Sequence, residues 1–213
     1  MKVKDEFISK LLKKINFENK NILEIGCGDG FRTHRFAQAK GSKINAIDPD
    51  VKSIFKAKKN NSEKNIEYIV GSAEKLSFNK SVFDIVIFTL SLHHILLPKK
   101  ALGEARRVLK NLGVIVVIEP GFEGSIFEAE IFFDCFDGDE RNKKAKTYQV
   151  ILQDSCMKEK MEFWGKTEWQ FDSLSDFKKN MHPKKNLQFL GNFLKENQYK
   201  LIGERRINVF KKI

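Results

Sequence analysis

Short apolar runs alternate with amphipathic stretches over residues 21–119. The apolar runs are rich in Ile, Val and Phe and show little polar alternation, which is typical of strands covered on both faces. Strands are predicted at 21–25, 43–47, 66–70, 83–88 and 114–119, with helices at 31–39, 51–60 and 99–109. This order predicts an α/β, Rossmann-like, doubly wound and mostly parallel sheet with helices on both faces.

Different patterns flank this region. Before it, apolar residues recur every three or four positions, at Phe7, Ile8, Leu11, Leu12 and Ile15. They predict a helix that packs on its own domain, although a basic amphipathic helix can also lie on a membrane surface. After it, the alternation stops. We therefore expect a core at 1–120, an inserted lid after the fifth strand at 121–185, and a closing helix with one or two strands at 186–213.

Composition narrows the class of protein. The chain has 213 residues, 41% of them hydrophobic and 31% charged, which suits one folded domain with an insertion. Cys27, Cys135 and Cys156 are too few and too widely spaced for a disulfide framework or a zinc site. Without a signal-like N-terminus or a run of membrane-spanning length, we expect a cytoplasmic protein with no membrane partner.

The net charge of +11 favours anionic partners such as nucleic acid. The lysines are scattered through nearly every segment, however, and a lysine-rich surface mainly confers solubility. Nucleic-acid binding stays open as the second possibility.

The segment from Ile22 to Gly30 runs from a buried strand into a glycine-rich turn. Glycines suit a sharp turn that a ligand approaches closely. A dinucleotide-binding fingerprint would place another glycine at the position of Phe31, so the spacing does not fit NAD. Asp48 ends the second strand, where an acid can accept hydrogen bonds from both ribose hydroxyls of a nucleoside, although Asp before Pro also starts turns.

The glycines at 26, 28 and 30 follow Glu24 as G-x-G-x-G, which resembles motif I of the class I S-adenosylmethionine (SAM)-dependent methyltransferases, especially the ubiquinone-biosynthesis and small-molecule group. The resemblance covers most of residues 21–119. It implies that SAM is the cofactor, that its methionine part passes over the glycine turn, and that Glu24 holds its ammonium group. The implied cofactor residues here are Glu24, Gly26, Cys27, Gly28, Gly30, Asp48 and Pro49.

Two later segments resemble the same family. Residues 71–78 are similar to its adenine-binding turn, with Ser72 where many relatives have Asp. The Ser72 hydroxyl can still accept a hydrogen bond, and the backbone N–H of Ala73 can serve a ring nitrogen. Glu74 in this turn, and Thr89 and Leu90 after the fourth strand, complete the expected cofactor residues.

Methyl transfer from a sulfonium mainly requires alignment, because the cofactor supplies the driving force. A base is needed only when the acceptor must lose a proton, and the candidates are His93, His94 and Glu119. One of the two adjacent histidines could instead stabilise the loop. No metal site is expected, because no ligand cluster stands at suitable spacing.

The acceptor itself is not specified by the sequence. The Asn/Asp-Pro-Pro-aromatic element and the Pro-Cys pair of base methyltransferases are missing, so a small-molecule acceptor is expected first. A tRNA or protein methyltransferase and a non-catalytic SAM-binding module stay open.

Residues 121–140 contain seven acids, five phenylalanines and no Lys or Arg, a composition that would suit an apolar or cationic acceptor. An amphipathic helix or a dimer contact explains this composition equally well, and so the oligomeric state stays open.

Overall fold

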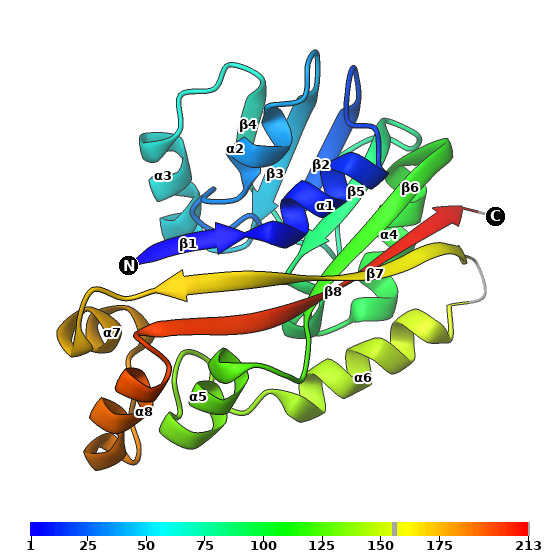
Figure 1. The fold of residues 1–213 in the computed structure, drawn as a ribbon. Coiled ribbons are helices and arrows are strands. Elements are labelled where there is room, and N and C mark those ends of the chain that lie inside the picture. Colours follow the sequence, from blue (N-terminus) through cyan, green and yellow to red (C-terminus); the bar gives the residue numbers. More distant parts are fainter. Residues whose placement is uncertain (155–156, 213) are drawn as a thin grey trace.

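The structure is a computed structural model that describes residues 1–154 and 157–212; Cys156 lies outside the described residues. One sheet in the described chain has the strand order β1-β7-β8-β6-β5-β2-β3-β4 (Figure 1). Its strands are β1 (Lys2–Asp5), β2 (Asn21–Ile25), β3 (Lys43–Asp48), β4 (Ile66–Val70), β5 (Phe83–Thr89), β6 (Leu109–Pro120), β7 (Met157–Gln170) and β8 (Lys200–Lys212).

The strands from β2 to β6 pair in parallel, as predicted. β8 runs antiparallel between β6 and β7, and β1 pairs antiparallel with one end of β7. The α/β class and the mostly parallel sheet are therefore confirmed. The five predicted strands are all present, and Lys200–Lys212 form one long closing strand where one or two were expected.

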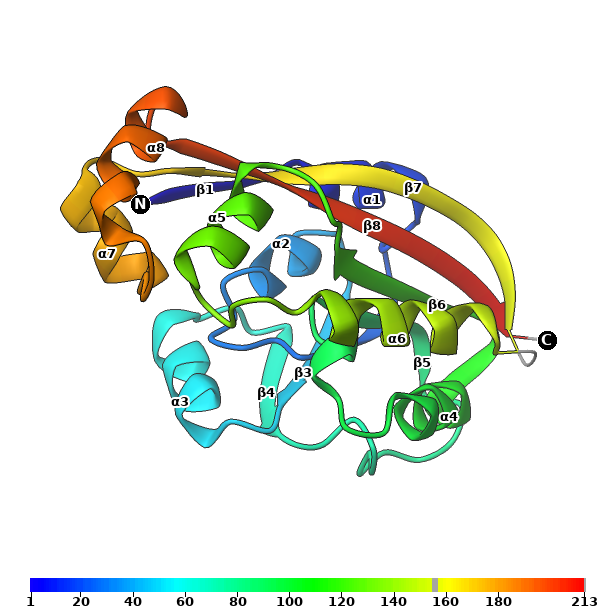
Figure 2. The same cartoon turned by 90° about the horizontal axis from the view of Figure 1, so that it is seen from below.

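Helices cover both faces of the sheet (Figures 1 and 2). On one face lie α1 (Glu6–Lys14), α2 (Thr33–Ala37) and α3 (Val51–Asn60), and on the other lie α4 (Pro98–Val108) and α6 (Arg141–Leu152). Side chains of β2 alternate between the two cores: Ile22 packs with the first group of helices, whereas Leu23 and Ile25 pack with the second. This alternation places Glu24 on the same face as α2.

The segment predicted as an inserted lid is divided by the sheet. Its residues 157–170 form β7, which pairs with β8 along its length. The sequence pattern predicts no strand there, because β-branched runs are lacking. From Met161 onward, however, the strand alternates small or apolar residues with charged or polar ones, apart from Trp164, as a strand with one buried face does.

The rest of that segment forms α5 (Ser125–Phe133), α6 and α7 (Leu174–Met181). Together with α8 (Leu190–Glu196), α5 and α7 pack around a third apolar cluster at one end of β7 and β8. Trp169 is buried in this cluster, while Trp164 is 44% exposed. The prediction of a helix over 31–39 was too long, because α2 has only five residues.

A buried polar network fixes β1 to the sheet. The Asp5 carboxylate, 2% exposed, accepts hydrogen bonds from Arg32 Nε (3.0 Å) and Thr167 Oγ1 (2.7 Å). Arg205 Nε in turn donates to Thr167 Oγ1 (3.1 Å). Burial lowers the pKa of Arg205 to about 10. These contacts join β1, β7 and β8 to the loop before α2.

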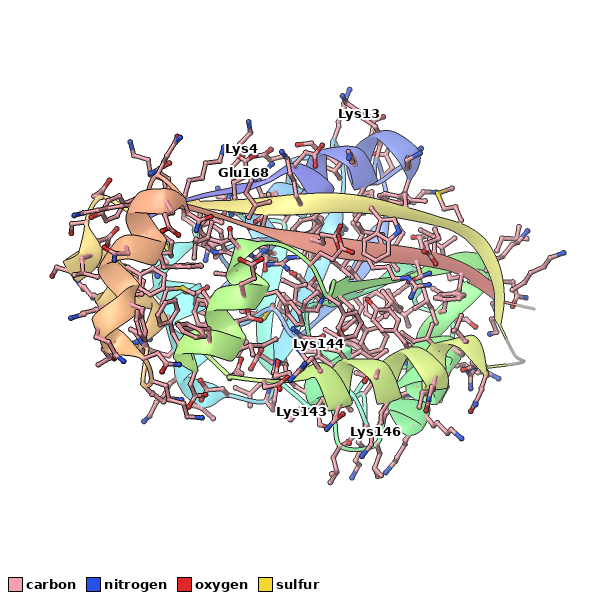
Figure 3. The ribbon with its side chains drawn as sticks, turned by 60° about the horizontal axis from the view of Figure 1, so that its bottom comes forward. Lys4, Lys13, Lys143, Lys144, Lys146 and Glu168 are labelled. Carbon is pink, nitrogen blue, oxygen red and sulfur yellow. The ribbon has the colours of Figure 1, made fainter. Side chains whose placement is uncertain are left out.

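Positive charge is distributed over separate elements rather than gathered on one. Figure 3 shows Lys4 and Lys13 along β1 and α1, with Lys143 and Lys146 on α6 at the opposite side. Lys144 is 2% exposed and lies 3.5 Å from the Glu130 carboxylate. Among the helices of the described chain, none combines the length and apolar composition that a bilayer crossing requires.

Candidate active site

A cavity of about 380 Å³ lies at the carboxyl ends of the parallel strands. Ligands of open α/β sheets bind at this edge, and the volume falls within the usual range for small-molecule sites. The lining comes from the ends of β2, β3 and β4 and from the segment after β5. It consists of Ile25, Gly26, Gly28, Ile47, Asp48, Pro49, Gly71, Ser72, Ala73, Glu74, Leu90, Ser91, His94, Ile95 and Leu96.

The three glycines after β2 meet different structural requirements. Gly28 has φ +54°, and a Cβ built there would meet nothing within 4 Å. It therefore faces open space in the cavity. A Cβ on Gly26 would lie 2.2 Å from Ser91 Cβ, and one on Gly30 would lie 2.7 Å from Tyr68 Oη. Gly26 and Gly30 thus permit close packing, and Gly30 is not part of the cavity lining.

Asp48 links the two predicted parts of the cofactor site. Its Oδ2 accepts a hydrogen bond from the backbone N–H of Gly28 (2.9 Å), and its Oδ1 accepts one from Asp50 N (2.9 Å). The carboxylate is half-buried at the cavity wall, beside exposed Pro49. Each carboxylate oxygen retains a lone pair that can accept from a ligand hydroxyl.

The turn after β4 closes the next part of the cavity. Ser72 Oγ accepts a hydrogen bond from the backbone N–H of Glu74 (3.2 Å), so this hydroxyl stabilises its own turn. Glu74 Oε1 accepts from Leu97 N (2.8 Å), which ties the turn to the segment after β5. Ala73 is buried between them.

Beneath the glycine turn lies a buried polar group without satisfied hydrogen bonds. Both carboxylate oxygens of Glu24 are fully buried, and neither has a hydrogen-bond partner of good geometry among the described residues. The hydroxyls of Thr33, Tyr68 and Thr89 are in the same condition. Burial raises the pKa of Glu24, a shift that Thr33 and Thr89 only partly offset.

Unsatisfied buried polar atoms are rare in folded proteins and call for a partner such as water or a ligand. A cationic ligand group entering above this carboxylate would satisfy it, and the ammonium of SAM has that character. Glu24 and Thr89 do not line the cavity. Their buried oxygens lie beneath it and could interact with the predicted cofactor from below. Cys27 also lies below the wall, with Sγ 3.7 Å from Gly28 O, and burial raises the pKa of its thiol.

The structure brings the three predicted catalytic residues together at the end of β5 and β6. His93 Nδ1 forms a hydrogen bond with Glu119 Oε2, and Glu119 Oε1 accepts from Leu92 N (3.0 Å). His93 and Glu119 are buried, whereas His94 lines the cavity. The two imidazole rings lie with their centroids 4.0 Å apart.

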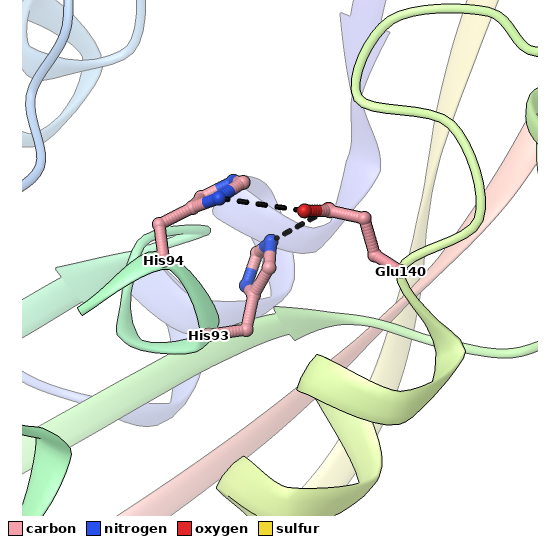
Figure 4. A group of neighbouring side chains, drawn as sticks. All are labelled: His93, His94 and Glu140. Carbon is pink, nitrogen blue, oxygen red and sulfur yellow. Dashed lines mark ion pairs between the residues drawn. The ribbon is translucent and has the colours of Figure 1, made fainter. Parts of the chain in front are cut away.

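Glu140, which the sequence analysis did not select, completes this group (Figure 4). Its Oε2 lies 3.3 Å from His93 Nε2, and its Oε1 lies 3.5 Å from His94 Nδ1. Burial and neighbouring His93 lower the pKa of His94, although Glu140 and Asp137 oppose this. The pKa of Glu140 is lowered in spite of burial, because Lys143 and the two histidines favour its charged form.

Glu140 precedes α6 and lies far from the histidines in sequence, so no local spacing could indicate it. Other cavity residues were missed for a simpler reason. Ser91, Ile95 and Leu96 carry no motif and come into the wall because the chain turns at Leu90, which has φ +52°. Ser91 Oγ donates to Ile25 O (2.8 Å) and so fixes this turn against β2.

Comparison with known proteins agrees with this geometry. Residues 23–117, which include the glycine turn, Asp48 and the histidine pair, match the family described as methyltransferase domain. Together with the relatives below, this match supports a class I SAM-dependent methyltransferase that uses SAM as its cofactor.

The ubiquinone/menaquinone biosynthesis C-methyltransferase UbiE of Rickettsia prowazekii is 33% identical to this chain over 125 residues. The match covers 54% of this chain and 49% of that protein, so it spans about half the length of the relative.

Two solved structures share the fold of nearly the whole chain. A SAM-dependent methyltransferase from Aquifex aeolicus has a TM-score of 0.62 at 16% identity and covers 95% of this chain and 89% of its own. The PH0226 protein from Pyrococcus horikoshii OT3 has a TM-score of 0.62 at 18% identity, covering 97% and 88%. At these identities the likeness concerns the fold.

Proposed function

We propose that this protein transfers the methyl group of SAM to a small-molecule acceptor. SAM supplies the methyl group and leaves as S-adenosylhomocysteine, while the acceptor loses a proton if the reacting atom carries one. The observation that carries the proposal is the open face of Gly28 beside the Asp48 carboxylate, with buried Glu24 below. The UbiE relatives, which are named for ubiquinone and menaquinone biosynthesis, support a small-molecule acceptor.

In this proposal, residues in and beneath the cavity wall each contact a different part of the cofactor. Asp48 accepts hydrogen bonds from the ribose hydroxyls, and Glu24 interacts with the ammonium group. The adenine lies against the turn of Ser72 and Ala73, where the Ser72 hydroxyl keeps one lone pair although it already accepts from Glu74. Pro49 and Leu90 add apolar contacts on either side.

The acceptor would occupy the end of the cavity next to His94. Of the three candidate catalytic residues, His94 alone lines the cavity, so it is the one proposed to face the acceptor. His93 and Glu119 lie behind it and are proposed as positioning residues. Of the parts of the expected lid outside the sheet, α5 and α6 are proposed to limit which acceptors enter, because Glu140 at the start of α6 contacts both histidines.

A cytoplasmic location is part of the proposal. It is supported by the free thiols of Cys27 and Cys135, as expected in a reducing compartment. Nucleic acid is the second candidate acceptor, and its support is the net charge of +11.

The test has two stages. Calorimetry with SAM and with S-adenosylhomocysteine measures binding, and incubation of the protein with methyl-labelled SAM and fractionated cell extract measures transfer. Label in a small organic molecule supports the proposal. Label in tRNA or in protein would contradict a small-molecule acceptor and identify tRNA or protein as the acceptor. Binding of SAM without label in any fraction would identify a SAM-binding module that does not transfer the methyl group.

A further inference from the structure

The group formed by His93, His94 and Glu140 has the composition of a metal site. Each residue offers one ligand atom, and the three atoms lie within 4.8 Å of one another. Two imidazoles and one carboxylate are donors that suit zinc and other borderline divalent ions. Their arrangement arises from two distant parts of the chain, the end of β5 and the start of α6.

Two of the distances are close to those between donors that share one ion, although they reach different oxygens of the Glu140 carboxylate. Two donors bound to one zinc ion at about 2.05 Å in tetrahedral geometry stand about 3.3 Å apart. His93 Nε2 and Glu140 Oε2 are 3.3 Å apart, and His94 Nδ1 and Glu140 Oε1 are 3.5 Å apart. Figure 4 shows both rings directed towards the one carboxylate.

We propose that His93 Nε2, His94 Nδ1 and the Glu140 carboxylate bind one divalent transition-metal ion of the zinc type. Three protein ligands leave a fourth position for water or for an oxygen or nitrogen of a small molecule, as in catalytic rather than structural zinc sites. His94 borders the cavity, so this fourth position is reached from the cavity side.

Glu119 supplies the support that a metal-binding histidine requires. When His93 Nδ1 donates its hydrogen bond to Glu119, Nε2 is left free to bind an ion. A carboxylate behind a ligating imidazole is a recurrent feature of metal sites. Glu119 is itself held by Leu92 N, so the ring orientation is fixed before an ion arrives.

Charge balance also favours a cation here. The side chains of Glu119 and Glu140 are 1% and 7% exposed, and Asp137 Oδ2 lies 3.9 Å from His94 Nε2. The opposing cation at Glu140 is Lys143, whose Nζ lies 3.0 Å from Oε1. Its side chain is 59% exposed, so it can leave the carboxylate for solvent when an ion binds.

Cobalt(II) is the probe, because its four- and five-coordinate centres absorb strongly in the visible range. Untagged protein is stripped with a chelator and titrated with Co²⁺ without SAM, so that failure of the cofactor assignment cannot affect the result. We expect one ion per chain, with Zn²⁺ displacing it. Glu140→Gln and His94→Gln should weaken binding at least about tenfold, and Glu119→Gln about 10- to 100-fold with a shifted spectrum.

The chain has four histidines, so His34→Gln and His182→Gln are matched controls that should bind Co²⁺ as the parent does. Circular dichroism confirms that each variant is folded. Because the His94 side chain is half-exposed, its replacement should not disturb the packing of the core. The proposal is overturned if the parent shows no visible bands, if Glu140→Gln and His94→Gln retain them, or if the control variants lose them equally.

Discussion

Replacement of Glu24 by Gln should make the protein without SAM more stable and its binding of SAM weaker. The substitution keeps the size of the side chain and removes its charge. In the protein without ligand, the charge is buried with no hydrogen-bond partner of good geometry among the described residues. The amide that the substitution introduces, by contrast, can donate to the hydroxyl of Thr33 or Thr89, which lie near enough to influence the carboxylate.

The two effects can be given rough sizes. An unsatisfied buried polar group is unfavourable by about 1–3 kcal/mol, and more when it is charged, so the free energy of unfolding should rise by about 1 kcal/mol or more. For a chain of this length, each kcal/mol raises Tm by about 2–4 °C. Loss of a charge-assisted contact with the ammonium should weaken SAM by about 1.5–3 kcal/mol, or about 10- to 150-fold in Kd.

The pKa of Glu24 determines how the stability difference between the parent and Glu24→Gln depends on pH. Because burial raises this pKa, the folded chain holds the proton more tightly than the unfolded chain does. The resulting stabilisation is fully present below the unfolded-state pKa and is lost as pH rises through the raised folded-state pKa. The stability advantage of Glu24→Gln over the parent should therefore grow as the pH rises through that range.

Thermal and urea unfolding of both proteins at matched pH values, with and without SAM, provides the measurement. Comparison at the same pH cancels the titration of all other groups. A variant that is less stable than the parent at neutral pH and binds SAM with unchanged affinity would refute the reasoning on both counts.

Three further substitutions test separate parts of the structure. Asp48→Ala should weaken the binding of SAM and S-adenosylhomocysteine alike by about 1.5–3 kcal/mol in calorimetry. The control Asp50→Ala, which removes the α3 cap, should lower stability by about 0.5–2 kcal/mol and leave the affinity unchanged. Equal affinities for the two variants would contradict the ribose assignment. Gly28→Val should abolish SAM binding in a chain that circular dichroism shows to be folded, with Gly191→Ala as the control that retains binding. Asp5→Ala should lower the free energy of unfolding by about 1–3 kcal/mol in urea titration, because it leaves the buried Thr167 hydroxyl and half-buried Arg32 without the carboxylate that accepts from them, and a loss under about 0.5 kcal/mol would show that the network contributes little.

The parallel half of the sheet was predictable because it is buried on both faces, which leaves uninterrupted apolar runs such as 83–88 in the sequence. β7 was not recognised, because a strand exposed on one face alternates and its charged residues resemble those of a loop. The helix after the glycine turn was predicted too long for a related reason. Apolar residues there suggested a helix from residue 31, whereas residues 31 and 32 still belong to the turn and α2 begins at Thr33.

The cavity-lining residues on the strand ends, such as Gly28 and Asp48, were predictable from motifs, since glycine spacing and a terminal acid are local features. Which glycine faces the cavity was not, because that depends on contacts with Ser91 and Tyr68 from other elements. Glu140 was also beyond the sequence, as its place beside His93 results from how α6 packs across the end of the sheet.

The position of β8 between β6 and β7 has a consequence for the order of folding. The pairs among β2, β3 and β4 join segments close in the chain and can form early, whereas the pairing of Lys2 with Gln170 must close a loop of most of the chain. β7 has no neighbour on its inner side until β8 is inserted. Loop-closure entropy therefore places the docking of β8 on β6 late and the pairing of β1 last. Refolding should show a slow phase in which the edge of β6 is still unpaired, and in that phase the chain is most exposed to aggregation.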